Sequence, residues 1–227
     1  MKWGVKALLV LAALLLFYQL WLLGHVLYWR WYNPAFTAFM SEQQARLQEN
    51  NPDAEIRYQW VPYNRISVQL KRAIVASEDA KFLDHDGFDW EGIQVAWEKN
   101  LKKGRIVAGG STISQQLAKN LFLSSKRTPW RKVEEAIITV MLEAVLDKRR
   151  IFEIYLNVIE WGNGVFGAEA AARHYYHTRV ANLGPMQAAK LAAMVSNPRY
   201  YDTHRSDRRL ARKTAILLRR MNYAEIP

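Results

Sequence analysis

Gly109-Gly-Ser-Thr-Ile-Ser-Gln-Gln-Leu-Ala-Lys-Asn120 is the stretch that decides the fold, because it joins a glycine turn to a helix start. Thr112 and Gln115 fit a capping box, in which each side chain satisfies free backbone donors at a helix start. The unpaired N–H groups of that first turn are predicted to hold an anion beside Gly109 and Gly110. Two stripes follow at helical spacing, a polar one of Thr112, Gln116 and Lys119 and an apolar one of Ile113, Leu117 and Leu121.

Outward from this segment, helical periodicity continues through most of the chain. No alternating pattern typical of a strand series is present, and Gly or Pro residues punctuate the helical pattern. The sequence therefore predicts one compact, all-α (mainly helical) domain. The expected helices cover residues 66–83, 89–102, 112–122, 130–146, 150–156, 167–175, 185–195 and 206–221.

Near the N-terminus, residues 7–29 form an apolar run without formal charge that is long enough to span a bilayer. The run exceeds the apolar core of a cleaved signal peptide, so an uncleaved anchor is predicted, with a buried core helix as the alternative. Lys2 and Lys6 precede it, which places the N-terminus in the cytoplasm and the rest outside. The expected organisation is an N-terminus and transmembrane anchor over 1–30, a juxtamembrane linker or helix over 31–56, and the folded domain over 57–227.

The formal net charge of +11 suits a protein that works against phosphates. No nucleic-acid-binding motif accompanies this charge, and an external domain rarely meets DNA, so anionic lipid or a phosphorylated substrate is expected instead. The absence of cysteine excludes disulfides and thiolate metal sites. Basic residues of the final segment either lie against anionic lipid or form a solvated face. They are Arg205, Arg208, Arg209, Arg212, Lys213, Arg219 and Arg220.

Glu78 interrupts an apolar stripe whose members recur at intervals of four. Partial burial raises the pKa of a glutamate, which prepares it for general acid or base work near neutral pH. The alternative is a surface pair of Glu78 and Asp79 that points to solvent. For the neighbouring His85 a structural role is favoured over proton exchange. The apolar members of the stripe are Ile66, Leu70, Ile74 and Phe82.

A second set of charged residues begins the helix predicted from residue 130. Charge alone does not choose between Glu134 and Glu135, and Arg131 with Glu135 also fits an ordinary surface pair. Two candidate carboxylates on different helices, a cationic cluster and a helix start suited to anions together indicate glycosyl chemistry on a phosphorylated substrate.

Five ordered blocks give the chain a resemblance to monofunctional biosynthetic peptidoglycan glycosyltransferases, a family that also supplies the glycosyltransferase half of class A penicillin-binding proteins. The resemblance covers about three quarters of the chain, and the order of the blocks makes coincidence an inadequate explanation. They are Glu-Asp-x-x-Phe-x-x-His-x-Gly at 78–87, GGSTISQQLAKN at 109–120, Arg-Lys-x-x-Glu at 131–135, Ile-x-Glu-x-Tyr-Leu-Asn at 151–157 and Gly-x-Gly-x-x-Gly-x-x-Ala-Ala at 162–171.

The resemblance implies a lysozyme-like, two-lobed fold, with a helical head and a smaller membrane-facing jaw. It implies lipid II and the growing lipid-linked glycan as substrates, Glu78 as the general base, and Glu135 as the carboxylate that assists at the donor pyrophosphate. Glu135 would act directly or through a divalent cation, Mg²⁺ or Mn²⁺, and no tightly bound cofactor is expected. Glu153 and Asn157 are expected to be structural. The positions that match the donor site are Ser111, Thr112, Gln116, Lys119, Asn120, Arg131 and Lys132.

By the same resemblance, the protein is expected to be a single-pass protein of the cytoplasmic (inner) membrane with its catalytic domain on the periplasmic face. The bilayer and cell-division or elongation proteins are the further expected partners, and nucleic acid is not one. A lysozyme-like lytic enzyme would also explain Glu78, but not the cations directed at a pyrophosphate. A non-catalytic, membrane-anchored cell-wall binding protein is the third interpretation.

Overall fold

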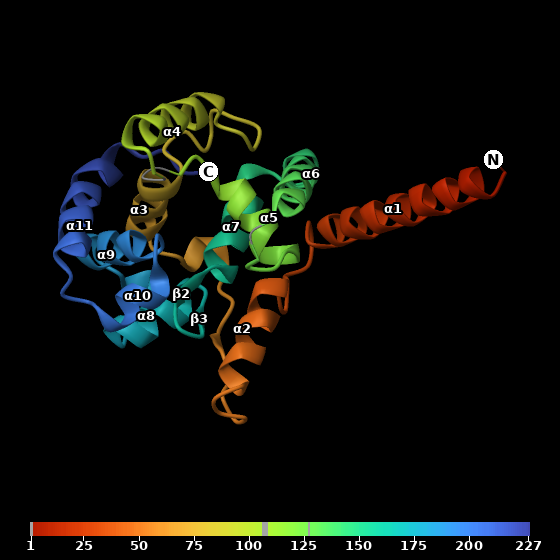
Figure 1. Ribbon diagram of the computed structural model, residues 1–227. Coiled ribbons are helices and arrows are strands. Elements are labelled where there is room, and N and C mark those ends of the chain that lie inside the picture. The colour runs from red at the N-terminus through yellow and green to blue at the C-terminus, as the bar shows by residue number, and fades with distance from the viewer. Residues whose placement is uncertain (1, 106–108, 127) are drawn as a thin grey trace.

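The computed structural model describes residues 2–105, 109–126 and 128–227, and it confirms the prediction of a mainly helical fold (Figure 1). A long first helix, α1 (Lys2–Tyr28), projects from a body formed by the other elements. The helices of the body are α2 (Ala38–Gln48), α3 (Val68–Glu78), α4 (Trp90–Lys103), α5 (Ile113–Phe122), α6 (Pro129–Val145), α7 (Lys148–Val158), α8 (Ala168–Tyr176), α9 (Pro185–Met194), α10 (Pro198–Thr203) and α11 (Arg208–Arg220).

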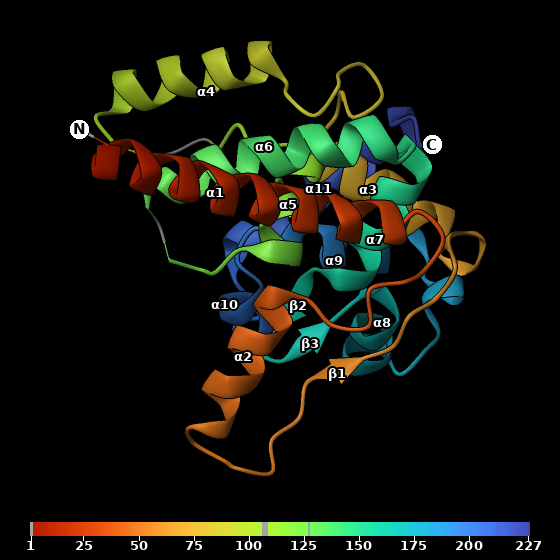
Figure 2. The same ribbon diagram turned by 90° about the vertical axis from the view of Figure 1, so that its right-hand side faces the viewer.

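Helix α1 has the length and composition of a membrane span. Within the described residues it is the one helix that meets both criteria, over Trp3–Tyr28 with a mean hydropathy of 2.2. Most of its large apolar side chains are exposed, whereas Leu22 and Val26 are buried. The end of α1 that carries them packs beside α6 (Figure 2). The alternative of a buried core helix therefore does not fit, and the helix suggests a single-pass membrane anchor.

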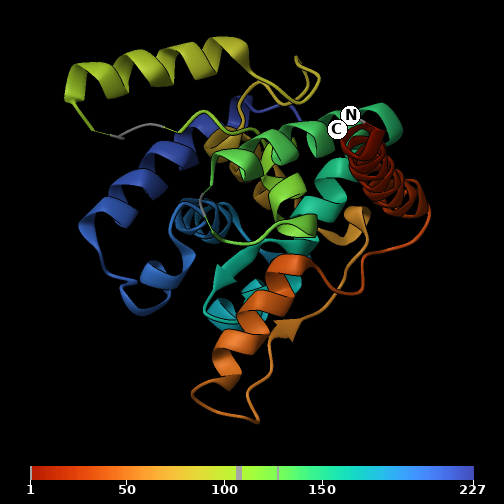
Figure 3. The ribbon, with the colours of Figure 1, turned by 45° about the vertical axis from the view of Figure 1, so that its right-hand side comes forward.

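Two packed groups of helices form the body. Helix α5 packs against α6 and α7, and α9 packs against α3 and α11. Large aromatic side chains fill the core between them, including the fully buried Phe82, Phe152 and Tyr155. Helix α4 packs little against the other elements and lies at the edge of the molecule (Figure 3). The two groups thus hold α3, α5 and α11 in fixed relative positions.

Segment 31–56 contains α2, whose Met40 is fully buried and belongs to the same hydrophobic core as the later helices. Helix α2 packs on α5. Its start is capped by Thr37, whose side chain accepts from the backbone N–H of Met40. The packing therefore continues across the boundary expected at residue 57.

A small sheet of three short strands accompanies the helices, although the sequence shows no pattern typical of a strand series. Strands β1 (Arg57–Tyr58), β2 (Glu160–Gly162) and β3 (Val165–Phe166) pair in the order β1-β3-β2, with β1 parallel and β2 antiparallel to β3. These strands are too short for an alternating pattern to be read from the sequence.

Two glycines of the fifth block make the turns around this sheet. Gly164, between β2 and β3, has φ +70°, and Gly167 has φ +81°. A Cβ on Gly167 would lie 2.6 Å from the carbonyl oxygen of Asn157. Their role as turn residues is thereby confirmed.

One predicted helix boundary is wrong and one helix was missed, each for an identifiable reason. The helix expected to reach residue 83 ends at Glu78, because Asp79 leaves helical geometry at φ −162° and turns its carboxylate toward the start of α5. Phe82 still reaches the core from the following turn. Helix α10 is not among the expected helices, because it begins at Pro198 and prolines are interpreted as punctuating the helical pattern. Proline is nevertheless well suited to the first position of a helix.

Candidate active site

The start of α5 is built as the sequence predicts, but it is not free to bind an external anion. Thr112 and Gln115 form the capping box, with each side chain bonded to the other's backbone N–H. The N–H of Ile113 donates to Oδ2 of Asp79 at 3.0 Å. The Asp79 carboxylate therefore occupies the positive end of the helix, and the prediction of an open anion cradle at this terminus is wrong.

The Asp79 carboxylate also explains the role of the neighbouring His85. Nε2 of His85 lies 3.0 Å from Oδ1 of Asp79, and Nδ1 of His85 accepts from the N–H of Gly87 at 3.1 Å. The hydroxyl of Thr112 donates to the carbonyl of Gly87 at 2.7 Å. These bonds tie the end of α3, the following loop and the start of α5 together, so His85 has the structural role expected of it.

Glu78 faces inward from the last turn of α3. Its side chain is 11% exposed and that of Asp79 is 2% exposed, which excludes a solvent-facing pair. Oε1 of Glu78 accepts from the hydroxyl of Ser77 at 2.7 Å, and Oε2 accepts from Nε2 of Gln116 at 3.2 Å. Both carboxylate oxygens are thus held by donors from two helices.

Gln116 is itself oriented by a buried tyrosine. The hydroxyl of Tyr155 donates to Oε1 of Gln116 at 3.0 Å. Burial raises the pKa of Tyr155 well above its usual value, so the phenol keeps its proton and acts as a donor. The amide NH₂ of Gln116 must then face Glu78, which fixes the orientation of the Glu78 carboxylate.

Lys213 of α11 approaches Glu78 from the opposite helix, with Nζ 3.8 Å from Oε1. Lys213 is one of the basic residues of the final segment, for which the sequence predicts contact with lipid or solvent and not a place beside Glu78. A signal was present, because Lys213 lies three residues after Leu210 and four before Leu217, and both leucines are buried. That spacing puts the lysine on the inward side of the helix.

A cationic hollow of about 320 Å³ lies next to Gln116. Three cations and one carboxylate line it, which leaves an excess of two positive charges. Nε of Arg131 is buried and has no hydrogen-bond partner among the residues that the structure describes. The predicted site residues that meet in this hollow are Ser111, Gln116, Lys119, Arg131, Lys132 and Glu135.

Glu135 organises the cations of this hollow. Its side chain is 5% exposed, Lys132 contacts Oε1, and Nη1 of Arg131 lies 3.4 Å from Oε2. Glu134 instead accepts from the hydroxyl of Tyr18 on α1 at 2.6 Å. The structure therefore separates the two glutamates that charge alone left open, and only Glu135 faces the hollow.

Lys119 is a partly buried cation of the hollow. Burial lowers the pKa of its ammonium group below the usual value, with Arg131 and Lys132 adding to the effect and Glu135 opposing it. Within the three described segments its side chain has no hydrogen bond or ion pair. An anionic ligand that reached Lys119 would restore the stability of its charged form.

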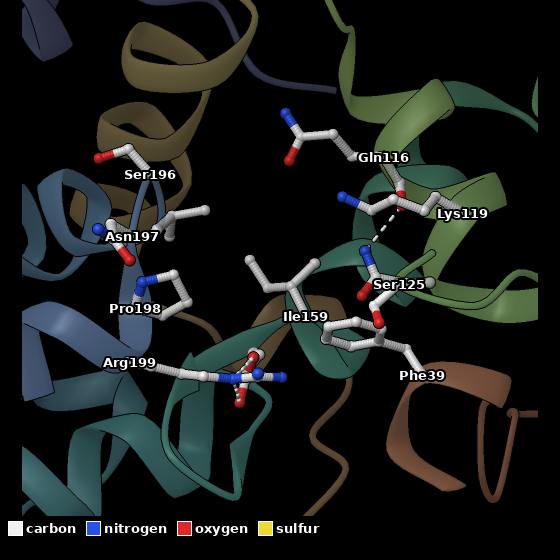
Figure 4. A pocket seen from close by; sticks show the side chains of 12 residues that line it. Phe39, Gln116, Lys119, Ser125, Ile159, Ser196, Asn197, Pro198 and Arg199 are labelled. Carbon is white, nitrogen blue, oxygen red and sulfur yellow. Dashed lines mark hydrogen bonds and ion pairs between the residues drawn. The ribbon is translucent and has the colours of Figure 1, made fainter. Parts of the chain in front are cut away.

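A second hollow of about 310 Å³ continues the cleft on the other side of Lys119 and Gln116 (Figure 4). Asn120 lines it and donates to the carbonyl of Gln116 at 2.7 Å. The opposite wall includes Arg199, whose Nε bonds both oxygens of Glu160 at 2.9 and 3.0 Å. Phe39 of α2 and Ser125 of the loop between α5 and α6 line both hollows. The sequence did not predict either residue, because both segments reach the cleft only through tertiary packing.

Two predicted site residues do not line either hollow. Thr112 is 2% exposed, and its hydroxyl is used within the fold, so it holds the start of α5. Glu78 reaches the hollows only through its bond to Gln116. Glu153 and Asn157 bond the backbone of Tyr63 and Val61, which agrees with their expected structural role.

The single carboxylate of the hollow does not fit a metal held by the protein alone. Among the residues described, no group of three His, Cys, Asp or Glu side chains is placed to bind an ion. Both oxygens of Glu135 already face cations. A divalent cation would need oxygen ligands from another source.

Comparison with known proteins agrees with this geometry. Similar proteins include the biosynthetic peptidoglycan transglycosylases of Laribacter hongkongensis (76% identical, covering 100% of both chains) and Chromobacterium violaceum (69% identical, 98% of this chain and 97% of the relative). The biosynthetic peptidoglycan transglycosylase of Methylobacillus flagellatus is 64% identical and covers 98% of this chain and 97% of the relative. The model of the transglycosylase family matches residues 43–222, a span that includes α3, α5, α6 and α11. With a glutamate fixed beside a cationic hollow and relatives similar along their whole length, the chain belongs to the transglycosylase family.

Proposed function

We propose that this protein polymerises lipid II into β-1,4-linked glycan strands and releases undecaprenyl pyrophosphate. The observation that carries the proposal is the position of Gln116 and Lys119 on one helix, α5, between the carboxylate of Glu78 and the cationic hollow. A base and a pyrophosphate site so joined suit transfer from a lipid pyrophosphate donor. Membership of the family and the names of the relatives support the same activity.

In the proposed reaction, Glu78 accepts the proton of the acceptor's GlcNAc 4-hydroxyl. The hydroxyl oxygen forms a bond to the anomeric carbon of the donor's MurNAc, while the bond from that carbon to the pyrophosphate oxygen breaks. The electron pair of the broken bond leaves on the pyrophosphate, so attack from the opposite face converts the α linkage to β. Lys119, Arg131 and Lys132 stabilise the negative charge on the leaving group.

The remaining residues of the site position these groups. Glu135 holds Arg131 and Lys132 toward the hollow, and Gln116 holds Glu78. Ser111 and Asn120 offer polar side chains to the donor. For Thr112 the described contacts support a role in positioning α5 rather than direct contact with the donor.

We propose that no cofactor is tightly bound and that Mg²⁺ or Mn²⁺, where one takes part, enters with the donor pyrophosphate beside Glu135. The pyrophosphate oxygens would complete a ligand set that the protein alone does not provide. The purified protein is then expected to retain no stoichiometric divalent metal.

The proposed location is the cytoplasmic membrane, with one span, the N-terminus in the cytoplasm and the catalytic domain on the periplasmic face. Exposed apolar side chains on α4 and α6, such as Trp97 and Trp130, support contact with the bilayer close to the anchor. Cell-division or elongation proteins are proposed as partners on the resemblance alone.

The deciding experiment measures polymerisation of lipid II by purified protein in detergent. Glu78→Gln is expected to lower the rate by about 10²–10⁴-fold, because the amide cannot accept the proton. Glu49→Gln, at an exposed glutamate of the segment after α2, is the matched control and is expected to retain the wild-type rate. Release of fragments from finished glycan without polymer formation would refute the proposal and favour a lytic enzyme. Full activity of Glu78→Gln would exclude Glu78 as the base.

A further inference from the structure

A second hollowed surface lies on a part of the molecule that the proposed reaction does not use. Two adjoining hollows of about 530 and 390 Å³ share Gln59 and Arg173 in their walls. We call them together the basic groove. None of the residues that line it lines the two hollows of the active-site cleft. Its cationic or titratable nitrogen side chains are Arg57, Arg65, Arg173, Arg179, His174 and His177.

The charges of the basic groove are not balanced by the fold. Its one carboxylate, Glu169, already bonds Nε of Arg173 and the N–H of Val180, each at 2.8 Å. Arg65 and Arg179 are exposed and have no ion pair within the described part of the chain. Four arginines against one carboxylate leave an excess of three positive charges along one groove, which attracts an anionic partner.

One arginine of the groove is also held in place. Nη1 of Arg57 lies 2.6 Å from Nδ1 of His174, and Nε2 of that histidine lies 3.0 Å from Oδ1 of Asp202. Because neighbouring side chains order this guanidinium, less conformational entropy is lost when a ligand binds it.

The backbone of the groove suits an extended ligand. Arg57 and Tyr58 form β1, which is an edge strand because the sheet order is β1-β3-β2. An edge strand offers backbone groups to a further strand, and pockets beside it select the side chains of the added peptide. Figure 2 shows β1 and α8 at the opposite end of the molecule from α4, away from the apolar surface of α4.

We propose that the basic groove binds an extended acidic peptide segment of a partner protein. Backbone pairing at β1 would set the direction of the peptide. Its carboxylates would contact Arg57 at one end, Arg173 where the two hollows meet, and Arg65 and Arg179 at the other end. Charge complementarity selects the acidic sequence. This binding is separate from the proposed polymerisation of lipid II.

The test uses the full chain in detergent and a fluorescently labelled peptide of alternating Glu and Thr, with affinity measured by fluorescence anisotropy at about 150 mM salt. The variant Arg65→Glu/Arg179→Glu is expected to weaken binding by about tenfold or more. Its matched control, Arg208→Glu/Arg212→Glu, makes the same change in net charge on exposed positions of α11 and is expected to change affinity by less than about twofold. Arg65→Gln/Arg179→Gln tests the same site without charge reversal.

Equal weakening by the groove variant and the α11 variant would overturn the proposal, because general attraction to a basic protein would then explain binding. No binding of the Glu–Thr peptide to the wild type would also overturn it. Loss of binding to anionic lipid vesicles in the groove variant, with peptide binding unchanged, would identify a membrane as the occupant instead. Polymerisation of lipid II is measured in parallel and is expected to be unchanged in the groove variant, so failure of either proposal is distinguishable from failure of the other.

Discussion

At the scale of single residues, most charged side chains of the cleft are held by a partner, either from another element or, as for Arg131, Lys132 and Glu135, from the same helix. Gln116 of α5 bonds Glu78 of α3, and Tyr155 of α7 orients Gln116. Lys119 and Lys213 are exceptions, since Lys119 has no partner among the described residues and Lys213 reaches Glu78 only at 3.8 Å. The charge of Lys119 is therefore available to substrate, whereas that of Lys213 acts on Glu78.

The lowered pKa of Lys119 predicts that the activity depends on pH in the alkaline range. Because burial lowers the pKa of its ammonium group from the usual 10.5, the positive charge is lost at a lower pH than for an exposed lysine. The value of kcat/KM for the donor should therefore fall on the alkaline side as pH rises through that lowered pKa. Lys119→Arg keeps its charge over this range, so its alkaline fall should be smaller even if its absolute rate is lower. Lys126→Arg, an exposed control, should follow the wild type. Identical alkaline profiles for Lys119→Arg and the wild type would contradict this role.

Lys213 is predicted to position Glu78. Lys213→Met should lower kcat by about tenfold, equivalent to ~1.4 kcal/mol of barrier, because the cation beside Oε1 is lost. The KM for the donor should be unchanged, since Lys213 does not line the cationic hollow. Lys213→Arg should restore most of kcat, whereas Arg212→Met, an exposed control on the same helix, should have no effect. A change in donor KM alone would assign the lysine to substrate binding instead.

At the scale of elements, the end of α3 and the start of α5 form one unit. Asp79 joins them, because its carboxylate accepts from Ile113 at the start of α5 and contacts His85 of the intervening loop. This unit sets the distance between the base on α3 and the polar stripe on α5. It also explains why the helix with Glu78 stops where it does.

Asp79→Asn is predicted to destabilise this unit by about 2 kcal/mol, because an amide can accept only one of the two bonds and carries no charge at the helix start. The thermal midpoint in detergent should fall by about 4–8 °C for a protein of this size. Asp84→Asn makes the same charge change at an exposed loop position and should leave the midpoint unchanged. A normal midpoint for Asp79→Asn would show that the helix start does not depend on this carboxylate.

At the scale of the whole molecule, the anchor packs directly on a helix that lines the cleft. Helix α1 packs on α6, which carries Glu135 and two cations of the hollow. Beyond the anchor, Arg150 of α7 bonds the carbonyls of Trp29 and Tyr32 at 2.9 and 2.7 Å. The chain that leaves α1 is therefore fixed to the body.

A truncated variant that begins at Tyr28 lacks nearly all of α1 but keeps the hydrogen bonds of Arg150 to the carbonyls of Trp29 and Tyr32. Its rate on lipid II in liposomes should fall by about tenfold or more, because it loses confinement on the surface that holds the substrate. In detergent its rate should stay within a few-fold of the wild type. An equal loss in both media would indicate that α1 stabilises α6 rather than concentrating the enzyme on the bilayer.

Local patterns predicted much of this molecule. The capping box of Thr112 and Gln115 located the start of α5, and the apolar run of residues 7–29 located α1. Both features depend on residues close in the chain, so the sequence carries them directly. Lys213, Phe39 and the three short strands depend on contacts between distant segments, and their local patterns are too short or too mixed to reveal them.

By itself the sequence determined the helical class, the anchor and the residue types that belong to family motifs, because these follow from periodicity, hydropathy and local order. Only the tertiary structure decided which donor fills the start of α5, which of two adjacent glutamates faces the hollow, and which lysine approaches Glu78. The physical reason is that burial and pairing arise when helices pack. A carboxylate such as Asp79 then satisfies a helix start that the linear chain presents as free for a ligand.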